Sequence, residues 1–261
     1  MIFHGTGNNI NVQLYINTTC NLRCPYCFIR NGMLKGKEWV MSLQKVMLIK
    51  KFIPENCTIH LIGGEPTIHK DFLKIVKLFA DHKIEVFTNG TRKLLSPAEI
   101  GENVSYSCTF HQEMSKKFGR ERFLENIKDA KIFKVKVMLD GPESLDDFDF
   151  FVKHGFETEL RPLFGHPESI ENLPQRYKTA TILKQNYFLG EKKLSVNEAL
   201  KISFKGWYCQ PSAIIIFPDL SGYINCKRFR IIRNFKNLTP IICNSEKCDD
   251  WFLDGLKYDH T

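Results

Sequence analysis

Short apolar runs alternate with helix-like stretches over the first 165 residues of the chain. The runs are rich in β-branched and aromatic residues, as strands are, and lie at Val12–Ile16, Thr58–Ile62, Ile84–Thr88, Val104–Phe110, Phe133–Leu139 and Thr158–Leu163. Between most of them, apolar residues recur at helical spacing behind three candidate N-caps, which are Ser42, Asp71 and Ser144. This alternation indicates an α/β fold with a parallel sheet and right-handed crossovers.

The number of strand–helix units limits the architecture further. Six units are two fewer than a closed eight-stranded barrel contains, so residues 1–165 are predicted to form a partial (β/α)6 TIM-like barrel. Residues 166–206 are expected to be a linker with some helix. Within residues 207–261, Ala213–Phe217 and Tyr223–Asn225 flank a turn that contains glycine, which is typical of a β-hairpin. We therefore predict a barrel domain, a linker and a small C-terminal module.

Composition and charge indicate where the protein is located and which partners it can bind. The 261 residues are 43% hydrophobic, without an apolar run of transmembrane length, and the N-terminus lacks the features of a signal peptide. A cytoplasmic protein with no membrane partner is therefore expected. The net charge is +8, and part of the excess lies in the basic stretch 227–236. That stretch is either a solvated surface or a site for phosphates or an acidic peptide, and no nucleic-acid partner is expected.

Seven of the nine cysteines form two groups, one near each end of the chain. In a cytoplasmic protein such groups favour ligand or catalytic roles over disulfides. The first group is Cys20, Cys24 and Cys27, with the spacing C-x3-C-x2-C and no fourth cysteine nearby. Structural zinc sites more often show two C-x2-C pairs, so this spacing favours an iron–sulfur cluster. Three thiolates leave one iron of a four-iron cluster open to a substrate or cofactor.

Other chemistry-bearing residues lie where the predicted strands end, which is where barrels of this kind gather their active sites. Gly63-Gly64-Glu65-Pro66 follows the second strand, and Thr88-Asn89-Gly90 closes the third. Glycines allow a close approach to the backbone, and a carboxylate accepts hydrogen bonds from an ammonium. The polar residues along or beyond the later strands are Ser107, Thr109, His111 and Arg161. One end of the barrel is thus predicted to collect the cysteines, the glycines and these polar side chains.

The cysteine run and the glycine-glycine-glutamate motif together resemble the radical S-adenosylmethionine (radical SAM) superfamily. The resemblance implies a 4Fe–4S cluster on the three cysteines and a bound SAM that is cleaved reductively to a 5′-deoxyadenosyl radical, which removes hydrogen from a substrate. A flavodoxin- or ferredoxin-type electron donor is implied as well. By the same resemblance, the cofactor-binding residues are Tyr26 beside the adenine, Gly63, Gly64 and Glu65 at the methionine amino group, and Asn89, with Ser107, His111 and Arg161 as candidates by position.

The second cysteine group comprises Cys209, Cys226, Cys243 and Cys248. A zinc site or free thiols would explain it, but the hairpin between the first two cysteines resembles the auxiliary-cluster modules called SPASM and twitch. Four cysteines match the shorter twitch form, which implies a second 4Fe–4S cluster. The interval from Gly222 to Cys226 is one residue shorter than is usual in these modules.

The remaining expectations concern Cys108 and the substrate. Because side chains alternate along a strand, Cys108 should point away from Ser107 and Thr109. It is either a buried structural residue or a catalytic thiol that returns a hydrogen atom to a substrate radical. Three functions remain open: oxidation or rearrangement of a small molecule such as a sugar, amino sugar or nucleotide, epimerisation or cross-linking of a ribosomally made peptide, and a non-catalytic iron–sulfur redox or zinc protein.

Overall fold

A computed structural model gives the structure of the chain. It describes residues 10–31, 34–55, 57–141 and 143–163, and beyond these the shorter segments 173–174, 177, 187–189, 192–194, 208–209, 213–224, 227–229, 241–242 and 257–259. Nearly all of the predicted barrel is therefore described, together with parts of the C-terminal third.

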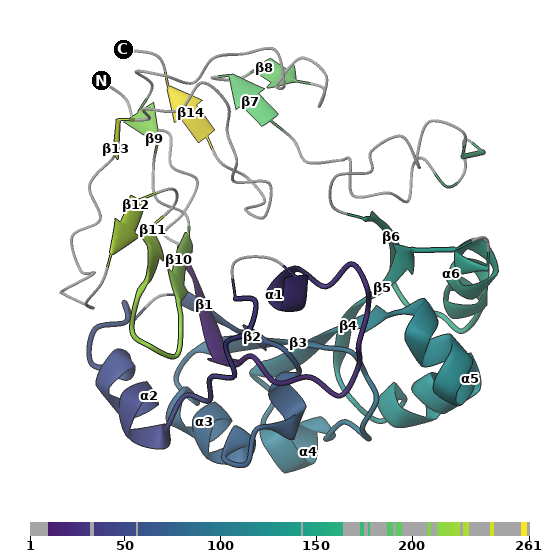
Figure 1. Ribbon diagram of the computed structural model, residues 1–261, viewed down its shortest axis with the longest axis horizontal. Helices are drawn as coiled ribbons and strands as arrows, with labels where there is room; N and C mark the ends of the chain where they lie inside the picture. The colour runs from purple at the N-terminus through teal and green to yellow at the C-terminus, as the bar shows by residue number, and fades with distance from the viewer. Residues whose placement is uncertain are drawn as a thin grey trace.

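The main sheet has nine strands in the order β12-β11-β10-β1-β2-β3-β4-β5-β6 (Figure 1). Strands β1 to β6 are parallel, and β10 adds a seventh parallel strand beside β1. The bounds are β1 Ile10–Asn17, β2 Cys57–Gly63, β3 Lys83–Thr88, β4 Val104–Phe110, β5 Ile132–Leu139, β6 Thr158–Pro162, β10 Ala213–Ile216, β11 Gly222–Ile224 and β12 Lys227–Phe229. The open parallel sheet agrees with the predicted partial barrel.

Helices follow the strands and lie along the outer side of the curved sheet (Figure 1). They are α2 Leu43–Lys50, α3 Phe72–Leu78, α4 Pro97–Ile100, α5 Gln112–Ile127 and α6 Ser144–Lys153, with the short α1 Phe28–Asn31 and the 3-10 turn η1 Pro66–Ile68 near the strand ends. Ser42 caps α2 as predicted, because its side chain accepts a hydrogen bond from the Lys45 N–H. Asp71 precedes α3 without a capping side-chain bond, and Ser144 is the first residue of α6 rather than its cap.

Helices and sheet enclose an apolar core on the outer side of the strands. Alternate residues of each strand point into it, among them Val12, Leu14 and Ile16 of β1, which are fully buried. Phe110 of β4, Phe123 of α5 and Phe151 of α6 pack edge to face, with ring centroids 5.1–5.2 Å apart. This aromatic group joins two helices to the sheet below the site.

The predicted hairpin exists and forms part of the main sheet. Strands β10 and β11 pair antiparallel around a turn in which the Asp219 carboxylate accepts hydrogen bonds from the Ser221 N–H and hydroxyl. The remaining short strands form a second sheet in the order β13-β9-β14-β7-β8. They are β7 Tyr187–Leu189, β8 Lys192–Leu194, β9 Tyr208–Cys209, β13 Ile241–Ile242 and β14 Lys257–Asp259. The region predicted as a linker with helix thus contributes two of these strands.

The second cysteine group falls largely outside the described residues. Cys209 ends β9, whereas Cys226, Cys243 and Cys248 lie in segments that the structure leaves undescribed. The twitch-type module and its cluster therefore stay predictions. Over the part of the chain that is described, no helix combines the length and apolar character of a transmembrane span.

Candidate active site

The three N-terminal cysteines lie in one loop that begins directly after β1. Cys24 is buried at 6% exposure, and Cys20 and Cys27 are half-buried. The Leu22 N–H and the Asn89 side-chain amide both donate to the Cys20 sulfur, at 3.4 and 3.5 Å. Burial raises the pKa of the Cys20 thiol, and burial together with the nearby Glu113 carboxylate raises that of Cys24 to about 12. Metal binding must therefore displace protons from these thiols.

The chemistry of this loop fits an iron–sulfur cluster. Its donor set is three thiols within eight residues, and one sulfur already receives two N–H groups, which stabilise a thiolate. Among the described residues, no three His, Cys, Asp or Glu side chains converge on the position of a single metal ion, as a zinc site requires. A four-iron cluster is held through a separate iron for each thiolate, so its ligands need no common point.

The paired glycines at the end of β2 contact the backbone that leads into the cysteine loop. The Gly64 N–H donates to the Asn17 carbonyl at 3.0 Å, and the Glu65 N–H donates to the Thr19 carbonyl at 2.8 Å. A Cβ at Gly63 would lie 2.2 Å from the Asn17 oxygen, and one at Gly64 would lie 2.1 Å from the Thr19 oxygen. The close approach inferred from the sequence is therefore made by the chain's own backbone as it enters the loop.

Glu65 is fully buried, and its carboxylate accepts four hydrogen bonds. The donors are the Thr67 N–H at 3.0 Å, the Thr67 hydroxyl at 2.6 Å, the Thr88 hydroxyl at 2.7 Å and the Asn89 N–H at 2.7 Å. Four bonds use about as many acceptor positions as a carboxylate has. In this arrangement Glu65 ties the ends of β2 and β3 together; three of the four donors share Oε1, and Oε2 accepts from Asn89 alone.

Asn89 carries this network on to the first cysteine. Its side-chain amide donates to the Asn21 side-chain oxygen at 3.0 Å as well as to the Cys20 sulfur, and its own oxygen accepts from the Thr91 hydroxyl at 2.6 Å. The predicted strand-end motif thus contacts the loop directly. A continuous hydrogen-bond path runs from Glu65 through Asn89 to the Cys20 sulfur.

Tyr26, directly before the last cysteine of the loop, reaches across to the ends of β4 and β5. Its hydroxyl donates to Asp140 and lies 2.9 Å from His111 Nδ1, while the Gln112 N–H donates to the same carboxylate at 3.1 Å. Burial lowers the pKa of His111 to about 4, so the ring is neutral at pH 7. Because the tyrosine proton is given to Asp140, we assign the Nδ1–H tautomer to His111, which then donates to the tyrosine oxygen.

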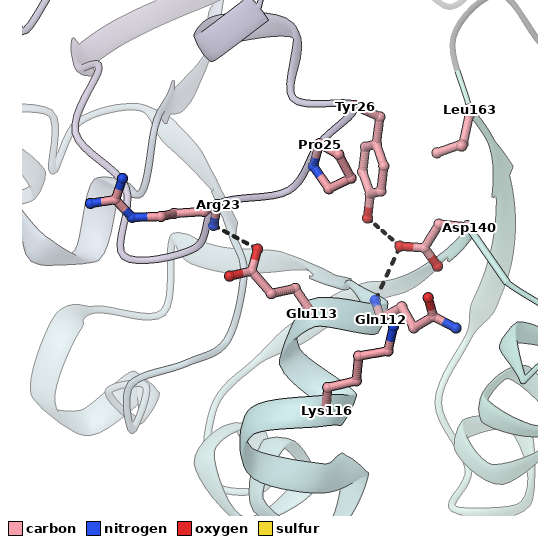
Figure 2. Close-up of a pocket in the computed structure, with 8 residues that line it drawn as sticks. All are labelled: Arg23, Pro25, Tyr26, Gln112, Glu113, Lys116, Asp140 and Leu163. Atoms are coloured by element: carbon pink, nitrogen blue, oxygen red, sulfur yellow. Dashed lines mark hydrogen bonds between the residues drawn. The ribbon is translucent and has the colours of Figure 1, made fainter.

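A pocket of about 560 Å³ opens beside Tyr26, between the cysteine loop and the start of α5 (Figure 2). Its lining residues are Arg23, Pro25, Tyr26, Gln112, Glu113, Lys116, Asp140 and Leu163. The size suits a small organic ligand, and the lining combines an aromatic ring with charges of both signs. Figure 2 shows Tyr26 and Gln112 both bonded to Asp140. Asp140 is not among the residues predicted from the sequence, although it directly follows β5 and the strand-end rule includes that position.

The other predicted residues lie deeper in the sheet. Ser107 donates to Glu85, and Arg161 lies 2.5 Å from Glu159. Cys108 is fully buried in the core between helices and sheet, on the face opposite Ser107, with Tyr106 and Phe110. This position fits the structural interpretation of Cys108, and we assign it no part in the chemistry.

Known proteins resemble this chain in sequence and in fold. The chain is 28% identical over 236 residues to GTP 3′,8-cyclase of Pasteurella multocida, which covers 82% of the chain and 68% of that protein. It is 25% identical over 170 residues to 7-carboxy-7-deazaguanine synthase of Aquifex aeolicus, covering 64% of the chain and 75% of that protein. These relatives are enzymes.

Solved structures and a family model complete the comparison. SuiB of Streptococcus suis bound to S-adenosylmethionine shares the fold with a TM-score of 0.55 at 13% identity, covering 85% of this chain and 63% of SuiB. This chain therefore spans less than two thirds of the length of SuiB. The family model described as the radical SAM superfamily matches residues 14–155, more than half of the chain, and includes the cysteine loop and the glycine-glycine-glutamate motif. The chain belongs to the radical SAM superfamily.

Proposed function

We propose that this enzyme cleaves SAM reductively and abstracts hydrogen from a small-molecule substrate. The observation that carries the proposal is the loop of Cys20, Cys24 and Cys27, held by Asn89 and bordered by the pocket beside Tyr26. When bound, the cluster and SAM supply an electron and a 5′-deoxyadenosyl radical that removes hydrogen from the substrate. Membership of the radical SAM superfamily supports the same chemistry.

The chain's own residues have distinct tasks in this proposal. The three cysteines hold the cluster, and the Asn89 amide and Leu22 N–H stabilise the thiolate form of Cys20. Glu65 fixes the ends of two strands under the loop. Tyr26, oriented by Asp140 and His111, presents its ring to the pocket. We assign the adenosine part of SAM to this pocket, because an aromatic ring next to charged hydrogen-bonding groups suits a purine and its ribose.

The cluster assignment is tested by anaerobic reconstitution. In the Cys24→Ala variant we expect the iron bound at the N-terminal site to be lost and 5′-deoxyadenosine formation to fall below detection after dithionite reduction with SAM. Cys57→Ala is the matched control, because Cys57 is buried to the same 6% exposure but lies at the start of β2. It should retain iron and SAM cleavage. Retained cleavage in the Cys24 variant would refute the assignment.

For the substrate, we propose a nucleotide-like small molecule. Two relatives that resemble this chain are named for GTP and for a deazaguanine, both of which contain fused purine-type rings. Incubation of the reduced enzyme and SAM with nucleotide, sugar and peptide candidates tests this proposal. A nucleotide that raises 5′-deoxyadenosine formation would support it. Stimulation by a peptide alone would replace it with peptide modification.

The second cysteine group is proposed to hold an auxiliary 4Fe–4S cluster. Only the backbone of Cys209 is described by the structure, so the support is the spacing of the four cysteines and the hairpin at β10 and β11. Reconstitution should give about eight irons per chain if both clusters form. About four irons with one zinc would indicate a structural zinc site instead. A flavodoxin- or ferredoxin-type electron donor stays a prediction.

A further inference from the structure

The inner side of the main sheet carries a row of charged and polar side chains. Strand register places His60 beside Glu85, Phe87 beside Ser107, and Lys136 beside Glu159, and in-register neighbours share a face. We call these side chains the inner row; its members are His60, Glu85, Ser107, Lys134, Lys136, Glu159 and Arg161. A parallel sheet that is covered on both sides usually reads as apolar throughout, so a charged row on one side calls for a functional explanation.

Both carboxylates of the inner row already have partners. Glu85 accepts a hydrogen bond from the Ser107 hydroxyl and lies 3.6 Å from His60 Nε2. Glu159 lies 3.0 Å from the Lys134 ammonium and 2.5 Å from Arg161 Nε. The Glu159–Arg161 contact has the distance of an ion pair without the angle of a hydrogen bond, so it is an electrostatic contact. Glu159 is therefore shared by two cations, whereas the partners of Glu85 are a hydroxyl and an imidazole.

Lys136 is the cation of the inner row that takes no part in these pairs. It is 8% exposed, and no carboxylate oxygen lies within 4.0 Å of its ammonium in the part of the chain that the structure describes. The ammonium lies 4.2 Å from the centroid of the Phe87 ring, which compensates only partly for lost hydration. Burial and the nearby Arg161 lower the pKa of Lys136 to about 8, although Glu85 and Glu159 act in the opposite direction. An anion placed at this point would therefore be bound by a charge that water does not fully solvate.

We propose that Lys136, with Arg161 beside it, binds an anionic group of the substrate, a phosphate or a carboxylate. This inference rests on the proposed function, because it concerns the small molecule from which hydrogen is removed. Lys136 lies on β5 four positions before Asp140, the residue that directly follows this strand, and four extended residues span about 13 Å. That length matches a small molecule whose charged end lies on the inner row and whose reacting carbon lies near the cysteine loop.

The test uses the reconstituted enzyme and three anions at matched ionic strength: inorganic phosphate, pyrophosphate and malonate. Binding is measured by calorimetry and by the rise in melting temperature. The wild type should bind at least one of them, Lys136→Met should weaken that binding at least tenfold, and Lys136→Arg should restore most of it. Tighter binding of pyrophosphate than of malonate identifies a phosphate site, and the reverse order identifies a carboxylate site.

Lys134→Met is the control for a general loss of positive charge, because Lys134 already pairs with Glu157 and Glu159. It should change anion binding less than threefold. Equal binding by the wild type and Lys136→Met, or no binding of any of the three anions at millimolar concentration, would overturn the anion site. SAM cleavage by the wild type is measured in parallel. Lys136-dependent binding without cleavage refutes only the proposed function, whereas cleavage without Lys136-dependent binding refutes only the anion site.

Discussion

The two sides of the main sheet differ although the same strands supply both. On β5, Val135 and Val137 point to the helices and are fully buried among apolar side chains, while Lys134 and Lys136 point to the inner side. On β4, Cys108 and Phe110 lie on the helix side and Ser107 on the inner side. The outer side is a packing surface that holds the fold together, and the inner side retains buried charge at a cost in stability. Proteins keep such costs mainly where binding or chemistry requires them.

The largest effect on stability is expected from breaking the outer side. Phe123→Ala removes the ring that packs against both Phe110 and Phe151, and should lower the free energy of unfolding by about 3–5 kcal/mol. Chemical denaturation of the metal-free protein measures this loss. Phe133→Ala is the matched control, because Phe133 is 52% exposed and its removal should change stability by no more than about 0.5 kcal/mol. Equal losses in both variants would contradict the assignment of the aromatic group to the core.

The next effect concerns the buried charge on the inner side. Lys136 has a pKa of about 8 in the folded chain, below the ordinary lysine value of about 10.4, so the unfolded chain binds more protons between these pH values. Stability should therefore rise with pH from about 8 to about 10, by on the order of 2 kcal/mol from this group. In Lys136→Met this rise should disappear, and the variant should be the more stable protein at pH 7.

The measurement is the difference in unfolding free energy between wild type and Lys136→Met at each pH. Taking the difference cancels groups that titrate equally in both proteins. The charged groups facing Lys136 are Glu85, Glu159, Arg161 and Lys134, and both proteins contain all four. A constant difference from pH 7 to pH 10 would mean that Lys136 does not titrate as described.

A single methyl group added at Gly64, where the sheet meets the cysteine loop, should change both stability and iron binding. Gly64→Ala would place a Cβ 2.1 Å from the Thr19 carbonyl oxygen, so the entry to the cysteine loop must shift. Such overpacking costs about 1–3 kcal/mol, and the displaced cysteines should bind less iron after reconstitution. Iron content and melting temperature are measured together. Full iron loading with unchanged stability would show that the contact between Gly64 and the loop is not rigid.

The smallest effect is expected at Tyr26. Tyr26→Phe keeps the ring at the pocket and removes both hydrogen bonds of the hydroxyl, the one to Asp140 and the one from His111. Asp140 still accepts from the Gln112 N–H. Stability should fall by about 1 kcal/mol, and iron content should stay at the wild-type level. Denaturation and an iron assay on the same preparation check both expectations. Loss of iron in this variant would mean that Asp140 holds the loop itself in place rather than the tyrosine side chain.

The six strands of the barrel were predictable because each is a compact run of β-branched and aromatic residues. The seventh, β10, was recognised as part of a hairpin, but its pairing with β1 depends on contacts about 200 residues apart that no local pattern encodes. Helix α5 was not assigned because its apolar residues lack a clear helical period, and Gly119 with φ +76° interrupts it.

The residues of the site also divide into those with a local sequence signal and those that depend on the three-dimensional structure. The cysteines and strand-end motifs are local signals, and the structure brings Asn89, Glu65 and Cys20 into one network. The inner row had a signal that sequence analysis left unused, because lysines at alternate positions of a buried parallel strand, such as Lys134 and Lys136, contradict the usual apolar pattern. Which of these charges stays without a partner depends on side-chain geometry, and only the three-dimensional structure provides that.

The pairing of β1 with β10 has a consequence for the order of synthesis on the ribosome. Strand β1 leads directly into the cysteine loop, and at one of its edges Asn11–Leu14 pair with residues 213–216. At translation rates of about 5–20 residues per second, roughly ten seconds or more pass between the synthesis of β1 and that of residues 213–216. During this interval β1 exposes unpaired backbone groups, which are a template for aggregation. Nascent chains that stall before residue 213 should therefore need protection at the strand that precedes the cluster ligands.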